Sequence, residues 1–365
     1  MLNTLLTLFF SLVMVGLLAV GLAYFWVWYY ASPTSQDETH YIRTKDGWRL
    51  AVHRYRSESG SKGLPVILCH GLSANRYTFD LRGAPSLARY LRHLGWDVWV
   101  PELRGSGMSQ RPGLFHSDVP YSWDFEDHLR QDLPAVMDFV LTRTGARSLH
   151  WVGHSMGGML LKAHIAANDN SPVASAVAVG SPAEFSNMKT KEVHALLQAK
   201  PLLRMIPLSP LGFLARLGIP FVHQFSFGFF HTPNVNPENC RKMTALAVEM
   251  LPSSKLWLNF ARFVETASFS SEGREPYLAG LSSSKVPVLL LGGAVDALAP
   301  PDSLVSSLEG QEGSENRKCL ILGKASGCQE DYGHVDLMVG TRSESEVFPL
   351  VLQWLTDNDP ILCKT

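Results

Sequence analysis

The sequence predicts an α/β fold in which helices flank a mostly parallel β-sheet. Short runs that are apolar throughout, as expected for strands buried on both faces, alternate with amphipathic runs of helical period. Strands that alternate with helices require crossover connections, which produce parallel strands. A second observation is a serine enclosed by glycines between one such strand and the following helix, in the stretch Gly153-His154-Ser155-Met156-Gly157.

Length and composition are those of a folded protein. The chain has 365 residues, of which 46% are hydrophobic and 18% charged, enough apolar surface for one large domain or two smaller ones. The formal net charge of −1 gives no indication of a polyanionic partner, so nucleic acid is not expected as a substrate. The oligomeric state stays open.

The N-terminal segment differs from the rest of the chain. Residues 5–31 carry no charged side chain, and the run is longer than the ~20 residues that a helix needs to cross a bilayer. Aromatic residues at 24–30 suit the membrane interface. No Lys or Arg precedes the run, and bulky aromatics stand where a signal peptide would be cleaved. We therefore expect residues 1–31 to form an uncleaved, single-pass transmembrane anchor of open orientation, followed by a polar linker at 32–39.

The expected strands and helices follow the linker in order. Strands are expected at residues 48–56, where polar and apolar side chains alternate, and then at 64–71, 96–105, 148–155, 173–183, 286–298 and 316–323. A loop and a helix are expected at residues 77–95, and helices at 125–145, 156–168 and, near the end of the chain, 345–357. These elements place the core of the fold at residues 40–183 and 285–358.

The alternation stops at residues 184–284, which are expected to form a lid or cap inserted into the core. Its centre, Pro201 to Pro233, is rich in proline and large apolar side chains. The phenylalanines there either form a small core of their own or line a pocket over the sheet, and both readings stay open: Phe213, Phe221, Phe225, Phe227, Phe229 and Phe230.

Ser155 is the candidate nucleophile. The glycines of a G-x-S-x-G motif permit a tight strand-to-helix turn, which exposes the serine hydroxyl above the sheet. The alternative is a plain helix N-cap. Because a serine hydroxyl is a weak nucleophile, the catalytic interpretation also requires a base and an acid that orients the base.

Asp296 and His334 are the candidate acid and base. Asp296 follows a buried strand at its carboxyl end, where ligands bind in open parallel sheets, and His334 follows the last strand. The order serine, acid, histidine is the one expected when the nucleophile lies on such a turn. Asp302 is an alternative acid, although it lies where a helix begins.

The backbone N–H groups of Leu72 and Met156 are the candidate oxyanion donors, because both follow strands at the same edge of the sheet. His70 is interpreted as a residue that shapes the loop, and His154 as structural. His128 and Asp132 share a helix face at i, i+4; without a third ligand they are expected on a solvated surface rather than at a metal ion.

The five cysteines fit no metal template. Cys69 is expected to be a buried small hydrophobe, whereas pairing of Cys319 with Cys328 is left open. Neither a metal nor an organic cofactor is expected.

Five motifs together resemble the α/β-hydrolase superfamily, and the resemblance extends from Thr39 to Asp357. They are CHGLSANRYTFD, PELRGSGMS, GHSMGG, LLLGGAVDALAP and YGHVDL. The layout is similar to the branch with acid-lipase-like and polyhydroxyalkanoate-synthase-like proteins. Polyester synthases of that branch use a cysteine nucleophile, so Ser155 favours hydrolysis. Many relatives have Asp where Glu102 stands here, a departure that affects no catalytic candidate.

The resemblance implies an α/β-hydrolase fold with a helical lid insertion and a serine hydrolase that cleaves hydrophobic carboxylic esters, like a lipase or esterase. Two alternatives stay open: an acyltransferase with the same triad, and an inactive scaffold that binds a lipid or protein. A dehalogenase or epoxide hydrolase would need Asp in place of Ser155.

Overall fold

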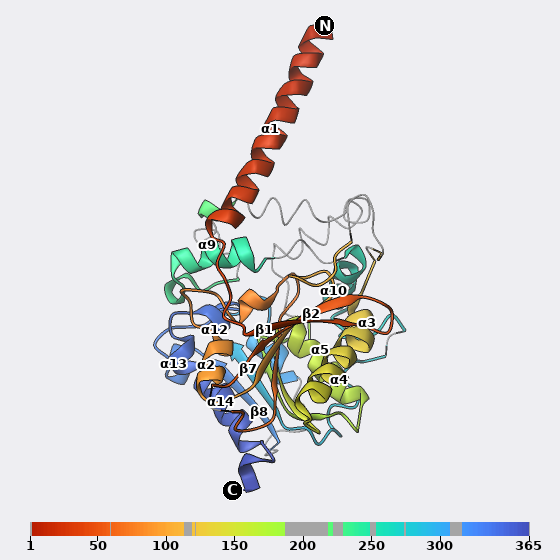
Figure 1. The fold of residues 1–365 in the computed structure, drawn as a ribbon, viewed down its shortest axis with the longest axis vertical. Coiled ribbons are helices and arrows are strands. Elements are labelled where there is room, and N and C mark those ends of the chain that lie inside the picture. Colours follow the sequence, from red (N-terminus) through yellow and green to blue (C-terminus); the bar gives the residue numbers. More distant parts are fainter. Residues whose placement is uncertain are drawn as a thin grey trace.

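An eight-stranded sheet forms the centre of the fold (Figure 1). The structure, a computed structural model, describes residues 2–58, 60–112, 119–120, 122–186, 218–221, 229–248, 253–273, 275–306 and 316–364. The strand order is β1-β2-β4-β3-β5-β6-β7-β8. The strands are β1 Glu38–Arg43, β2 Arg49–Tyr55, β3 Val66–Cys69, β4 Val98–Glu102, β5 Leu149–His154, β6 Val173–Val179, β7 Val288–Gly293 and β8 Arg317–Leu322.

The sheet is mostly parallel, as predicted. Only the pairs β1–β2 and β2–β4 are antiparallel, and every other neighbouring pair is parallel. Strands β3, β5 and β7 are buried along their whole length, which agrees with their continuous apolar sequences. Strand β1 was not predicted, because it begins inside the expected linker and mixes polar with apolar side chains at the edge of the sheet.

Helices cover both faces of the sheet, and the alternation of side chains along β3 shows how. Val66 and Leu68 pack in one core cluster with residues of α2 (Leu87–His93) and α14 (Phe348–Asp357). Ile67 packs in the other cluster, which includes residues of α4 (Leu133–Thr144) and α5 (Met156–Ala167). Loops at the carboxyl ends of the parallel strands are thereby held on a rigid base.

Shorter helices complete the core. They are α3 (Phe125–Asp127), a π-helical turn (His128–Asp132), α11 (Pro301–Val305), α12 (Asp336–Val339) and α13 (Ser343–Glu346). Single 3₁₀ turns lie at Arg76–Thr78, Ile219–Phe221, Thr232–Asn234, Lys324–Ser326 and Leu362–Lys364.

The expected insertion contains helices α9 (Pro237–Leu246) and α10 (Ser254–Thr266). Phe263 of α10 packs edge-on against Phe125, so this part of the insertion belongs to the main core. Phe213, Phe225 and Phe227 lie outside the described residues, as does most of Pro201–Pro233. Of the phenylalanines described there, Phe221 is 56% and Phe229 44% exposed, whereas Phe230 packs against the core.

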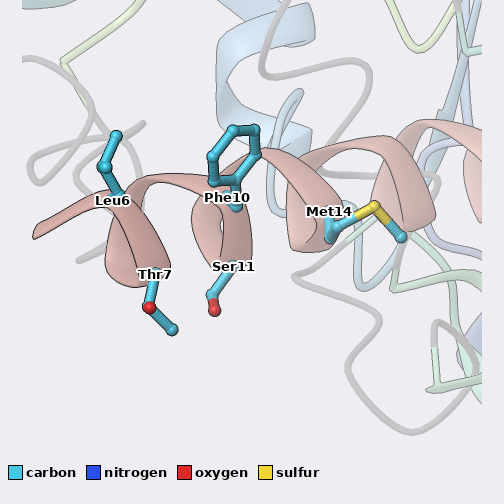
Figure 2. Close-up of a pocket in the computed structure, with 5 residues that line it drawn as sticks. All are labelled: Leu6, Thr7, Phe10, Ser11 and Met14. Atoms are coloured by element: carbon cyan, nitrogen blue, oxygen red, sulfur yellow. The ribbon is translucent and has the colours of Figure 1, made fainter. Parts of the chain in front are cut away.

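Helix α1 (Leu2–Tyr29) projects away from the sheet and its covering helices as a single rod (Figure 1). Its stretch Leu6–Tyr29 is long and apolar enough to cross a membrane by length and composition. One face of the helix borders an open hollow of about 660 Å³ (Figure 2), remote from the sheet; it is lined by Leu6, Thr7, Phe10, Ser11 and Met14.

Residues 32–37, called here the docked segment, are bound to the domain. Ser35 donates to the carboxylate of Asp80 from both its N–H (2.5 Å) and its hydroxyl (2.8 Å). The hydroxyl of Tyr77 donates to the carbonyl of Ser32 at 2.9 Å, and Arg92 donates to the carbonyl of Ser35 at 3.1 Å. The segment that joins α1 to the sheet therefore lies against the domain surface.

Candidate active site

Ser155 lies on a sharp turn between β5 and α5. Its backbone has φ 53° and ψ −121°, which costs a non-glycine residue on the order of 1–3 kcal/mol. Two glycines make the turn possible, because a Cβ on Gly153 would collide with the backbone of Gly157, and one on Gly157 would collide with the carbonyl of Cys69. Strand, turn and helix thus have the arrangement that the G-x-S-x-G motif predicts.

Hydrogen bonds from the end of β6 support this turn. The N–H of Ser155 donates to the carbonyl of Val179, and the hydroxyl of Ser181 donates to the carbonyl of Ser155, both at 2.8 Å. The Nζ of Lys162 in turn donates to the carbonyls of Ser181 (2.8 Å) and Pro182 (3.2 Å). Burial lowers the pKa of Lys162 to about 7. No sequence motif pointed to this lysine, which lies in a helix whose other side chains are apolar apart from His164.

Asp296 and His334 form a buried pair. The Nδ1 of His334 lies 2.9 Å from Oδ2 of Asp296, and the two residues are 4% and 3% exposed. The other oxygen, Oδ1, accepts hydrogen bonds from the N–H groups of Leu298 and Ala299, both at 2.8 Å. The carboxylate is therefore held from both sides. Asp302, the alternative acid, is exposed in the first turn of α11.

The end of β6 and the residue after it lie close to Ser155 and to the Asp296–His334 pair. Val179 accepts the hydrogen bond from Ser155, and the next residue, Gly180, has φ +55°. A Cβ on Gly180 would lie 3.3 Å from Nδ1 of His334 and 3.4 Å from Oδ2 of Asp296. The last residue of β6 thus bonds the backbone of Ser155, and a side chain on the next residue would crowd the Asp–His pair. Gly180 was not identified from the sequence.

His154 links the turn at Ser155 to the loop of His334. Its Nε2 lies 3.0 Å from the carbonyl oxygen of His334, and the two rings are 4.8 Å apart between centroids. Burial, with a further contribution from His334, lowers the pKa of His154 to about 3. The ring is therefore neutral at pH 7, and its Nε2–H donates to the carbonyl. This contact agrees with the structural interpretation of His154.

The loop after β3 lies against Ser155. A Cβ on Gly71 would lie 2.8 Å from the Cβ of Ser155, so only glycine allows this approach. His70 shapes the loop as expected: its Nδ1 is 2.8 Å from the carbonyl of Gly71, and its Nε2 accepts from the N–H of Leu103 at 3.1 Å. Burial lowers the pKa of His70 to about 4, which keeps the ring neutral.

The two candidate oxyanion donors flank this contact. Leu72 follows Gly71 in the loop that touches Ser155. Met156 is the first residue of α5, and the first N–H groups of a helix have no acceptor within the helix. Both N–H groups thus belong to residues next to the Ser155 contact, and their role as oxyanion donors stays a prediction.

Comparison with known proteins defines the family. A family model described as "alpha/beta hydrolase fold" matches residues 65–322, from β3 to β8. The chain belongs to the α/β-hydrolase fold family. Among solved structures, a membrane phospholipase A described as a bacterial virulence factor superposes with a TM-score of 0.55 at 20% identity, covering 98% of this hydrolase-fold chain and 99% of that chain. At this identity the likeness concerns the fold alone.

Lipases are among the relatives of this α/β hydrolase by sequence. Lipase 1 of Drosophila melanogaster is 37% identical over 125 residues, 33% of this chain and 28% of that protein. Human gastric triacylglycerol lipase is 37% identical over 130 residues, 33% of this chain and 32% of that protein. The matched region spans about a third of the length of these curated relatives.

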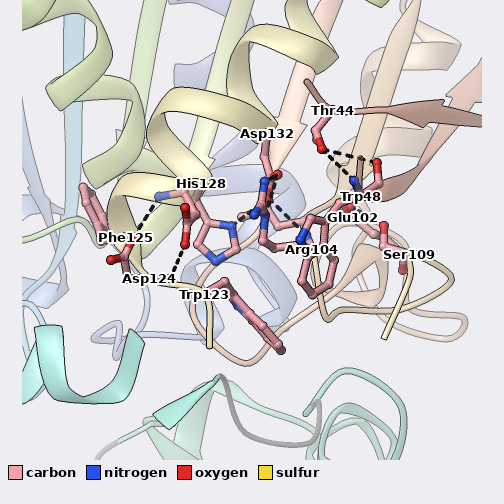
Figure 3. A network of polar contacts seen from close by, with 12 residues as sticks. Thr44, Trp48, Glu102, Arg104, Ser109, Trp123, Asp124, Phe125, His128 and Asp132 are labelled. Atoms are coloured by element: carbon pink, nitrogen blue, oxygen red, sulfur yellow. Dashed lines mark hydrogen bonds and ion pairs between the residues drawn. The ribbon is translucent and has the colours of Figure 1, made fainter. Parts of the chain in front are cut away.

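The pair His128 and Asp132 corrects one expectation about this α/β hydrolase. Both were expected on a solvated helix face, but they are 2% and 0% exposed. Nδ1 of His128 lies 2.8 Å from Oδ2 of Asp132, whose other oxygen accepts from Nε of Arg104 at 2.8 Å (Figure 3). Arg104 also bonds Asp46 at 2.7 Å. The i, i+4 spacing of the pair does not reveal Arg104, which follows strand β4 and bonds Asp132.

Glu102, which stands where many relatives have Asp, lies in a second buried network. It accepts hydrogen bonds from Nε2 of His53 (3.0 Å), Nη1 of Arg76 (2.9 Å) and the N–H of Met108 (2.6 Å). Burial by itself would raise the pKa of Glu102, but the bond from His53 and the charge of Arg76 outweigh it and lower this pKa to about 2. The carboxylate therefore supports the loop after β4.

The cysteines take no part in the site. All five are free thiols, and Cys69 is fully buried, as predicted, whereas Cys319 and Cys328 are not paired. Within the described residues, no group of three or more His, Cys, Asp or Glu side chains is arranged to hold a metal ion.

Proposed function

We propose that this chain is a membrane-anchored serine hydrolase that cleaves carboxylic esters with a hydrophobic acyl chain. The observation that carries the proposal is the buried Asp296–His334 pair, which shares the turn at Gly180 with the strained serine of a G-x-S-x-G turn. Relatives named as lipases by sequence support the same chemistry.

The reaction proceeds through an acyl-enzyme in this proposal. Nε2 of His334 takes the proton of Ser155 while Oγ attacks the ester carbonyl, and Asp296 holds the proton on Nδ1. The N–H groups of Leu72 and Met156 stabilise the negative oxygen of the tetrahedral intermediate. His334 then protonates the leaving alcohol, and a water molecule deprotonated by His334 releases the acid and regenerates the serine.

Two features support a hydrophobic acyl chain. Phe221 and Phe229 of the insertion expose 56% and 44% of their surface, so both rings are free to contact a hydrophobic chain or a membrane. In addition, the apolar stretch Leu6–Tyr29 of α1, 24 residues long, exceeds the roughly 20 residues that span a bilayer. An enzyme anchored in this way works where lipid esters are concentrated.

Fluorophosphonate labelling tests the nucleophile. Wild-type protein should be labelled, Ser155→Ala should not, and Ser283→Ala should be labelled normally because Ser283 is an exposed serine outside the site. A Ser155→Ala protein that is folded and still labelled would refute the assignment. If added alcohols are acylated faster than water releases the acid, the protein is an acyltransferase with the same triad.

A series of p-nitrophenyl esters, kept below their micelle concentrations, tests the substrate class. Each buried CH₂ contributes about 0.8 kcal/mol, close to fourfold in affinity. We expect kcat/KM to rise from acyl chains of two carbons to about eight. A flat or falling series would indicate a short pocket and a small-ester substrate instead.

A further inference from the structure

A small cavity adjoins the loop that carries the candidate oxyanion donors. Its volume is about 10 Å³, close to the smallest space that accommodates one water molecule. Gly71 and Ser73, which flank Leu72, form one side of the cavity, and Met156 and His128 also line it. The cavity is thus in contact with both segments that supply the proposed donors.

Ser73 has two unusual properties at this cavity. Its φ is 53°, a left-handed conformation that costs a non-glycine residue on the order of 1–3 kcal/mol. Its hydroxyl oxygen is buried and has no hydrogen-bond partner in the protein, which costs a further ~1–3 kcal/mol. A strained residue with an unsatisfied hydroxyl, next to Leu72, indicates a polar partner inside the cavity.

His128 supplies the second polar group. Its Nδ1 is occupied by Asp132 at 2.8 Å, and Asp132 is itself fixed by Arg104. Figure 3 shows the other ring nitrogen on the side of the imidazole that faces away from Asp132. The residue belongs to a π-helical turn, a distortion that is frequent at functional sites.

We propose that this cavity is a water site of the oxyanion loop. One water molecule donates to Nε2 of His128 and exchanges a hydrogen bond with Oγ of Ser73, as the donor and acceptor capacity of each group allows. The bound water fixes the side chain of Ser73, and through the backbone it holds the preceding Gly71–Leu72 peptide so that the N–H of Leu72 faces the oxyanion. Ser73 and His128 are positioning residues, and Asp132 holds the imidazole in place. The effect on hydrolysis rests on the proposed function; the water site does not.

Three substitutions separate the hydroxyl from the backbone strain. Ser73→Ala removes the hydroxyl and keeps the strain, whereas Ser73→Gly removes both. His128→Leu removes the second partner. Ala267→Gly is the matched control, because Ala267 has φ 50° at the C-terminal end of α10 and does not line the cavity. This substitution removes the same kind of backbone strain at a position outside the cavity.

Loss of one oxyanion donor costs about 10²–10³ in turnover, so a misplaced donor should cost somewhat less. We expect each Ser73 variant and His128→Leu to lower kcat on a short ester about 10- to 100-fold with little change in KM. Inhibition by a trifluoromethyl ketone, which forms the oxyanion, should weaken by the same factor. Ala267→Gly should match wild type. Wild-type kcat in Ser73→Gly would overturn the proposal, as would an equal change in KM and kcat.

A crystal structure of the wild-type protein, at a resolution that shows ordered waters, gives a readout independent of turnover. Density for a water within hydrogen-bond distance of Oγ of Ser73 and Nε2 of His128 is expected. An empty cavity overturns the proposal even in an active enzyme. If the water is present and no ester is hydrolysed, the water site stands and the proposed function fails.

Discussion

Replacement of Asp296 by Asn tests the triad through the tautomer of His334. The Asn side chain has one oxygen and one NH₂ group, and the N–H groups of Leu298 and Ala299 require the oxygen on their side. The NH₂ group then faces Nδ1 of His334, where it can only donate. Nδ1 must be unprotonated to accept this bond, so the proton moves to Nε2. In that tautomer the imidazole cannot take the proton of Ser155.

The size of the effect follows from the cost of turning the amide over. For His334 to keep its proton on Nδ1, the oxygen of the introduced amide must face Nδ1. The N–H groups of Leu298 and Ala299 then face the NH₂ group, and each unsatisfied buried donor costs about 1–3 kcal/mol. The total of roughly 2–6 kcal/mol corresponds to a loss of about 30-fold to 10⁴-fold in kcat/KM, since about 1.4 kcal/mol equals a factor of ten. The fold should be preserved because the two side chains have the same shape.

The assay is kcat/KM on p-nitrophenyl acetate together with the rate of fluorophosphonate labelling, and thermal unfolding verifies the fold. Asp302→Asn is the matched control: Asp302 is exposed, and its variant should stay within about twofold of wild type. A folded Asp296→Asn enzyme with more than about a tenth of wild-type kcat/KM would refute the tautomer argument. A large loss in Asp302→Asn would mean that the acid has been assigned to the wrong residue.

Three further predictions concern the support of the site. The pKa of Lys162 is about 7 in the folded protein and about 10.5 in a free lysine, so between these pH values the unfolded state binds more protons. The free energy of unfolding therefore rises with pH in this range. Urea titrations should show the rise in wild type relative to Lys162→Met, and parallel curves of stability against pH would contradict it. Gly71→Ala should lower kcat by at least tenfold, because its methyl group would lie 2.8 Å from the Cβ of Ser155; wild-type turnover on p-nitrophenyl acetate would show that the loop adapts. A protein that begins at Ser32 should hydrolyse this soluble ester like the full chain. A protein that begins at Glu38 should melt at a lower temperature than the one that begins at Ser32, because it lacks the bonds to Asp80. Equal melting temperatures of the two truncated proteins would show that these bonds contribute nothing.

The turn at Ser155 and the place of Asp296 were predictable because each follows a strand of mainly apolar sequence. Such strands are recognisable in isolation, and their carboxyl ends meet at one edge of a parallel sheet. Ser155 and Asp296 could therefore be grouped without coordinates, and the order serine, acid, histidine added His334. His334 lies farther from its strand, in the loop after β8, a strand that begins with Arg317 and Lys318. Strand β1 lacked this signal because it lies at an edge and carries mixed side chains.

The supporting residues could not be predicted, because their roles depend on partners distant in sequence. In the sequence, Lys162 is one polar residue in a mainly apolar helix. Its role becomes clear only from the carbonyls of Ser181 and Pro182, which accept its hydrogen bonds. The burial of His128 depends on Arg104, which arrives from the end of another strand. The left-handed backbone of Ser73 has no sequence signature either, since glycine or asparagine is the usual residue in that conformation.

The docked segment determines how an anchored enzyme would search for its substrate. A segment held through Ser35 and Tyr77 is not a flexible linker. An anchored domain would therefore stay at a constant distance from the bilayer and present the same face to it. Encounter with a lipid ester then becomes a two-dimensional process, governed by lateral diffusion within one leaflet. The rate on lipid esters would follow their mole fraction in the membrane rather than their concentration in bulk solution. Molecules in the opposite leaflet would react only after they had crossed the bilayer.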